Sequence, residues 1–192
     1  VKSGLTENVS VSHYRLAMHL FLAFVILTQI FWYFKNLITK RNKPFFNFSY
    51  SFISMKLFIF FIFLQIIIGA FVSGLDAGRI YQTWPLMNES FYPNDLVDAS
   101  FFSLIYFKEH GFVQFIHRNL AYLIFINFVF IGYKIYKEKI KDLYKIYLIL
   151  FFIIILQISL GITTLISGVN VLLASTHQIS SIFLVILSLA LY

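Results

Sequence analysis

The chain has 192 residues, of which 60% are hydrophobic and 12% charged, with a net charge of +7 and no cysteine. Soluble domains carry roughly 25% charged residues, so the composition excludes an ordinary soluble domain and indicates a protein of the lipid bilayer. The lack of cysteine excludes disulfides, cysteine-ligated iron–sulfur clusters and covalently attached c-type heme. The positive charge does not indicate nucleic-acid binding, because the basic residues gather in two connectors between apolar runs, where they set membrane orientation.

Five apolar runs are long enough to cross a bilayer core, which takes about 20 helical residues. The runs are continuous rather than alternating, which favours helices over a β-barrel. The expected fold is therefore all-α, a polytopic membrane helix bundle. We place its five transmembrane helices at Tyr14–Phe34, Met55–Val72, Phe112–Tyr133, Leu143–Ile166 and Leu172–Tyr192.

The connectors between these runs differ in charge. The first and third are rich in Lys and Arg, whereas the second, Ser73–Gly111, holds five acids against two bases. Because basic connectors stay inside, the second connector and the Ser167–Val171 turn are predicted to lie outside. The N-terminus of this chain is then outside and its C-terminus inside. Since the chain begins without Met and stops within an apolar run, we expect it to be a fragment of a longer protein.

Three runs carry a histidine near the end predicted to be outer: His19, His117 and His177. Each lies about five residues inside its helix, or roughly 7–8 Å at 1.5 Å per residue, so all three are expected in one layer. Ionisable groups inside a membrane are costly unless paired and therefore indicate a functional site. The alternative is three isolated histidines that reach out to the interface.

Neutral imidazole is the commonest metal ligand, and two imidazoles on facing helices suit the axial positions of a heme iron. His117 and His177 lie on helices that start on the same side and form the expected pair. Arg118 and Arg15 lie near the outer surface, where heme propionates would emerge. Gln114, one turn before His117, is a candidate hydrogen-bond donor to the site. A zinc site or proton relay fits less well, because no acid lies within the spans.

A short motif occurs twice. Leu64–Gly69 in the second run and Leu156–Gly161 in the fourth both read Leu-Gln-Ile-x-x-Gly, and each run is followed by a histidine run. This pattern indicates a repeated two-helix unit. Alternatively, Gln and Gly serve helix packing, and we assign neither Gln as a ligand. The loop at 74–88 mixes turn formers with aromatics, which fits a lid as well as an interfacial anchor.

At these residues the chain resembles the heme A synthase family. The histidine motifs are weak individually, but together with the Asp-Ala-Gly and Trp-Pro-Leu-Met loop they are specific. The matching stretches are Arg15–His19, Gly74–Gly78, Gln82–Met87, Val113–Arg118, Leu160–Leu165 and Leu173–Gln178. They follow family order from the first span to the fifth, with two of them in the loop after the second span.

The resemblance implies an eight-helix, pseudo-symmetric architecture of two halves. Residues 1–54 would hold the last span of the first half and a cytoplasmic connector, and residues 55–192 the heme-binding second half, with its outer loop at 73–111. His117 and His177 would then be the ligands of a heme b. His19 would belong to the first-half site as the ligand of the substrate heme, its partner lying upstream, so the fragment alone is expected to be inactive.

The activity implied by the resemblance is oxidation of the C8 methyl of heme O to a formyl, which makes heme A for cytochrome oxidase. The implied setting is a bacterial inner or mitochondrial inner membrane, with the lipid bilayer, heme O, heme O synthase and cytochrome oxidase assembly factors as partners. Two alternatives stay open. One is a bis-histidine b-type electron-transfer protein without substrate chemistry, and the other is a heme-free transporter or assembly scaffold.

Overall fold

The computed structural model describes residues 12–40, 53–94 and 107–192. Its elements are α1 (His13–Thr39), α2 (Ile53–Gly74), the 3-10 turn η2 (Ala77–Arg79), α3 (His110–Lys137), α4 (Lys141–Ile166) and α5 (Val171–Leu191). Within the described ranges the only extended pairing is an isolated bridge between Met87 and Ser90. The all-α prediction is confirmed, and each long helix starts within two residues of its predicted run.

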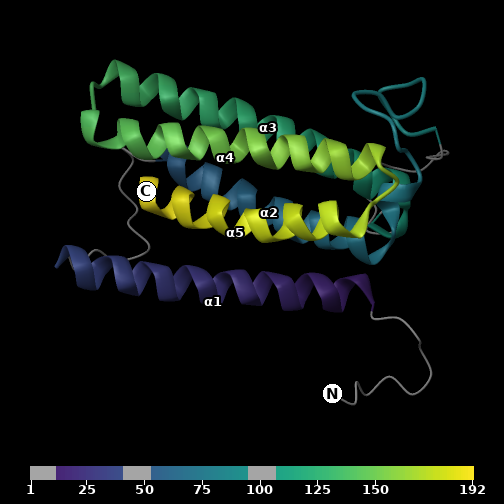
Figure 1. Ribbon diagram of the computed structural model, residues 1–192, viewed down its shortest axis with the longest axis horizontal. Coiled ribbons are helices and arrows are strands. Elements are labelled where there is room, and N and C mark those ends of the chain that lie inside the picture. The colour runs from purple at the N-terminus through teal and green to yellow at the C-terminus, as the bar shows by residue number, and fades with distance from the viewer. Residues whose placement is uncertain (1–11, 41–52, 95–106) are drawn as a thin grey trace, which may run out of the picture.

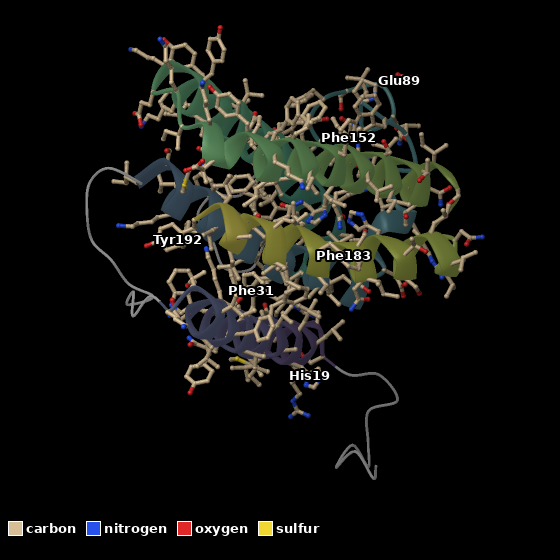
Figure 2. All side chains as sticks on the ribbon, turned by 60° about the vertical axis from the view of Figure 1, so that its left-hand side comes forward. His19, Phe31, Glu89, Phe152, Phe183 and Tyr192 are labelled. Atoms are coloured by element: carbon tan, nitrogen blue, oxygen red, sulfur yellow. The ribbon has the colours of Figure 1, made fainter. Side chains whose placement is uncertain are left out.

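All five long helices are able to span a membrane by length and composition, with mean hydropathies from 1.5 to 2.6. Large apolar side chains point outward from the bundle, among them Phe152 and Phe183 (Figure 2). Such an apolar exterior is what lipid-facing helices require. The protein is therefore an integral membrane protein with five spans in the described part, while the eight-helix architecture remains a prediction.

Three helices run in one direction and two in the other (Figure 1). α1, α3 and α5 begin at the end of the bundle that carries loop 75–94 and the α4–α5 turn, and the α3–α4 turn lies at the opposite end. The three histidine helices thus start from one end, as the sequence predicted. Which side of the membrane this end faces stays a prediction. Part of its charge argument, including Arg41, Lys43, Asp95 and Asp98, lies outside the described residues.

An aromatic cluster lies towards the end of the bundle opposite the histidines. Phe128 of α3 is fully buried and stacks on Tyr147 of α4, with ring centroids 4.4 Å apart. Phe58 of α2 packs against the Phe128 ring. Leu189 of α5 is also fully buried. α1 lies at the side of the bundle, against α2 and α5 (Figure 1). These buried side chains join α2 to α5 at one end of the bundle, and the histidines lie towards the other end.

The α4–α5 turn explains how the last histidine helix starts. Gly168 has φ +70°, a left-handed conformation that glycine adopts without steric cost. Asn170 then caps α5, its side chain accepting hydrogen bonds from the backbone N–H groups of Leu172 and Leu173. Such a cap satisfies donors that a helix cannot pair internally. Together these residues fix the start of the helix that carries His177.

Candidate functional site

His117 of α3 packs against the helix before it. A Cβ built on Gly69 of α2 would lie 3.1 Å from Cε1 of the His117 ring. One turn earlier on α2, Nε2 of Gln65 donates to the His117 carbonyl oxygen at 3.1 Å and lies 3.2 Å from Nε2 of the ring. Nδ1 of His117 is buried, and the described residues offer it no hydrogen-bond partner. An alanine at this position would require the imidazole to shift by a few tenths of an ångström.

His177 of α5 is held in the same way by α4. A Cβ on Gly161 would lie 3.3 Å from Cε1 of the ring. Nε2 of Gln157 donates to the His177 carbonyl oxygen at 3.2 Å and to Oγ of Ser180 at 2.8 Å. The Ser180 hydroxyl donates to the same carbonyl at 3.0 Å. Nδ1 of this ring is also buried without a partner in the part of the chain that the structure describes.

The two arrangements correspond to the repeated sequence motif. In each repeat the glutamine and the glycine are four residues apart, so they share one helix face, and that face meets the histidine of the following helix. His117 and His177 come seven and six residues after the first residue of their helices, so they lie at similar depth. The structure therefore places this predicted pair at one level of the bundle, at the end that carries the loop.

His19 and Arg15 lie elsewhere. Both are exposed on α1, and His19 points away from the other helices (Figure 2). His19 comes six residues after the start of its helix, which places it at a depth like that of the other two. Across the described ranges no group of three metal-ligating side chains is found. His19 thus lies apart from His117 and His177, and its assignment to a different site remains a prediction.

Arg118 and Gln114 bind the backbone of the loop that follows α2. Gln114 donates to the Tyr81 carbonyl at 2.8 Å. Arg118 donates to the same carbonyl through Nη2 at 3.0 Å and to the Leu86 carbonyl through Nη1 at 3.1 Å. The loop is thereby fixed to α3 within one turn of His117. The propionate role of Arg118 and the donor role of Gln114 toward a heme remain predictions.

The same loop also reaches the α4–α5 turn. A Cβ on Gly78 would lie 3.1 Å from a methyl carbon of Val169, and one on Gly168 would lie 3.6 Å from the Gln82 side chain. Met87 of this loop is fully buried, 1% exposed. The loop therefore covers the histidine end of the bundle and touches both repeats, which favours a packed lid over a separate interfacial anchor.

Comparison with known proteins places this geometry in a family. Residues 1–189 match the model of the family described as cytochrome oxidase assembly protein (COX15-CtaA). The chain belongs to this family.

The curated relatives of this family member agree with one another. The chain is 44% identical over 186 residues to the heme A synthase of Pelagibacter ubique, covering 95% of the chain and 53% of that protein. It is 39% identical to the heme A synthase of Rickettsia felis, covering 96% of the chain and 55% of the relative, and 37% identical to that of Maricaulis maris, covering 99% and 55%. The chain thus spans about half the length of the curated relatives it matches. No solved structure matches it.

In this member of the cytochrome oxidase assembly protein family, sequence reasoning identified the histidines but missed what holds them. Gln65 and Gln157 were interpreted as repeat positions or as helix-packing residues and not as partners of the histidines, and Ser180 was not singled out. The signal was the repeat itself, since a glutamine and a glycine recurring one turn apart before a histidine helix predict a shared contact. The sequence does not predict that Arg118 and Gln114 both donate to the Tyr81 carbonyl, because Tyr81 lies more than 30 positions before either of them.

Proposed function

We propose that the chain is part of a heme A synthase and that His117 and His177 hold a heme iron between α3 and α5. The activity is supported by relatives named heme A synthase at 37 to 44% identity. The heme assignment rests on one observation: two histidines at similar depth, each packed on a glycine of the preceding helix and each with a buried ring nitrogen that no described residue pairs.

The residues fit the group. Ionisable groups inside a membrane span are costly unless paired, so two imidazoles at similar depth favour a ligand that uses imidazole. Neutral imidazoles on facing helices are common axial ligands of heme iron in helix bundles. Gln65 and Gln157 hold the backbone of the two ligands, and the loop fixed by Arg118 covers this end of the bundle. When bound, the heme supplies one-electron redox chemistry.

The proposed conversion takes place at a second site. His117 and His177 would together hold one heme, so we assign them to an electron-transfer or structural heme b. His19, apart from them on the outer face of α1, is the proposed ligand of heme O, the substrate whose C8 methyl is oxidised to a formyl. The proposed setting is a bacterial inner or mitochondrial inner membrane, with the loop end outside. Heme O synthase and cytochrome oxidase assembly factors are the proposed partners.

The test is production of heme A. The gene product that contains this chain is expressed in cells that make heme O but lack their own heme A synthase, and the extracted pigments are separated by chromatography. Heme A should accumulate, and His177→Ala should abolish it, whereas Gln178→Leu, at the exposed neighbouring position, should not. Bound heme b without any heme A would instead support the bis-histidine electron carrier. A protein that binds no heme would contradict both readings.

A further inference from the structure

Gln65 and Gln157 are the amide side chains that join each histidine helix to the helix before it. Both lie in the apolar interior of a span, Gln65 half-buried and Gln157 8% exposed. Each donates from its amide nitrogen to the backbone carbonyl of a histidine on the next helix, at 3.1 and 3.2 Å. Buried polar side chains in membrane helices commonly join neighbouring helices by such bonds. Here both bonds end at the residue that carries a candidate ligand.

The carbonyl contact fixes the orientation of the Gln65 amide. A carbonyl oxygen only accepts hydrogen bonds, so the amide must present its nitrogen and not its oxygen to His117. The same nitrogen lies 3.2 Å from Nε2 of the ring and has a second hydrogen for it. Nε2 is then the acceptor, and in a neutral imidazole the ring proton lies on Nδ1. In the heme-free protein Gln65 thus contacts both the backbone and the ring of His117, whereas a metal bound at Nε2 would replace the ring contact and leave the carbonyl bond.

Gln157 makes only the backbone half of this arrangement. Its second amide hydrogen goes to Oγ of Ser180, which in turn donates to the His177 carbonyl. No bond from Gln157 to the His177 ring is formed. The two repeats are therefore alike in how they place the histidine helix and different in how they hold the ring.

We propose that Gln65 and Gln157 are a matched pair of positioning residues, which fix the rotation and height of the two histidine helices, and that Gln65 in addition sets the ring orientation of His117 in the heme-free protein. The glycine four residues later lets the ring close onto the same helix face, so each glutamine and glycine together define one imidazole position. The consequence for bound heme rests on the proposed function, whereas the consequence for the His117 ring does not.

The first test needs no heme. Protein labelled with 15N-histidine is purified without heme, and ring nitrogen shifts report which nitrogen of His117 carries the proton. The wild type should show the proton on Nδ1. Gln65→Met removes both donated bonds and should shift the population towards Nε2–H, while Gln157→Met should leave His117 unchanged. An identical His117 ring signal in wild type and Gln65→Met overturns the proposed role of Gln65.

The second test uses the heme-loaded protein. Removing a group that orients a metal ligand costs about 10- to 100-fold in affinity. Heme dissociation should therefore accelerate by about that factor in Gln65→Met and in Gln157→Met. The electron paramagnetic resonance g-values, which report ligand-plane orientation, should shift in both variants. Gln178→Met, on the exposed face of α5, is the matched control and should match wild type.

Folding and function are separated within the same set of variants. Gln65→Glu keeps the side-chain size, and as a neutral acid it donates one bond instead of two, so it should fall between wild type and Gln65→Met even if Gln65→Met does not fold. Dissociation rates within twofold of wild type and unchanged g-values in the folded variants overturn the positioning proposal. A wild type that never binds heme contradicts the proposed function instead, and the ring-nitrogen result then decides the role of Gln65 alone.

Discussion

The close contact between Gly69 and His117 gives the sharpest test of the site. Gly69→Ala places a Cβ 3.1 Å from Cε1 of the ring, so the imidazole must move by a few tenths of an ångström. Overpacking of this kind costs about 1–3 kcal/mol, and the alanine returns about 1 kcal/mol through helix propensity. Without heme the ring is able to shift, and we expect little net change in stability.

With heme bound, the ring is held at its iron and the cost appears in binding. A penalty of about 1–3 kcal/mol corresponds to about 5- to 150-fold weaker heme affinity, since about 1.4 kcal/mol is tenfold. Gly161→Ala should act in the same direction but less, because its Cβ would lie 3.3 Å from the His177 ring. Titration of heme-free protein with heme, followed by absorbance, measures both.

Gly132→Ala is the control. Gly132 lies on α3, 15 residues after His117, and a Cβ there would meet the Tyr147 side chain of α4. Gly132→Ala should therefore lower stability without changing the heme spectrum. Wild-type heme affinity and an unchanged spectrum in Gly69→Ala would refute the idea that this glycine exists to admit the ligand ring.

Three further predictions concern the rest of the chain. A cysteine replacing Asn88 should react with an impermeant thiol reagent from outside and one replacing Lys139 should not, with no native cysteine to interfere; the reverse pattern would invert the proposed orientation. Arg118→Gln removes two charge-assisted hydrogen bonds to the loop, each worth about 1.5–3 kcal/mol. Amide hydrogen exchange around Tyr81 should therefore accelerate about tenfold or more. Unchanged protection would show that Arg118 does not hold the loop. In the whole gene product, His19→Ala should abolish heme A formation and leave the low-spin heme spectrum nearly intact; persistent heme A would remove His19 from the substrate site.

The elements of this fold follow from sequence because bilayer length and hydropathy determine them. The runs starting at Tyr14 and Leu172 became α1 and α5 with boundaries shifted by one residue at their starts. The depth of the histidines followed from helix geometry, which is local. The common end of the three histidine helices followed from charge in the connectors and from the alternation of direction that short turns impose.

What the sequence did not predict depends on contacts between distant segments. The donation from Arg118 to Tyr81 and Leu86 requires the loop to fold back over α3, and no local pattern encodes that path. The repeat indicated that Gln65 and Gly69 share a helix face. The contact of Gln65 with the His117 ring, however, depends on how α2 and α3 pack. The aromatic stack of Phe128 on Tyr147 likewise depends on the α3–α4 pairing.

The most direct measurement of the central claim is the absorbance and paramagnetic resonance spectrum of the purified, heme-loaded chain, with and without its two candidate ligands. The wild type should show a low-spin bis-histidine heme. His117→Ala or His177→Ala alone should abolish it or convert it to high spin, while His110→Ala, at the exposed start of α3, should leave it unchanged. A low-spin spectrum that survives the double replacement of His117 and His177 would contradict the assignment.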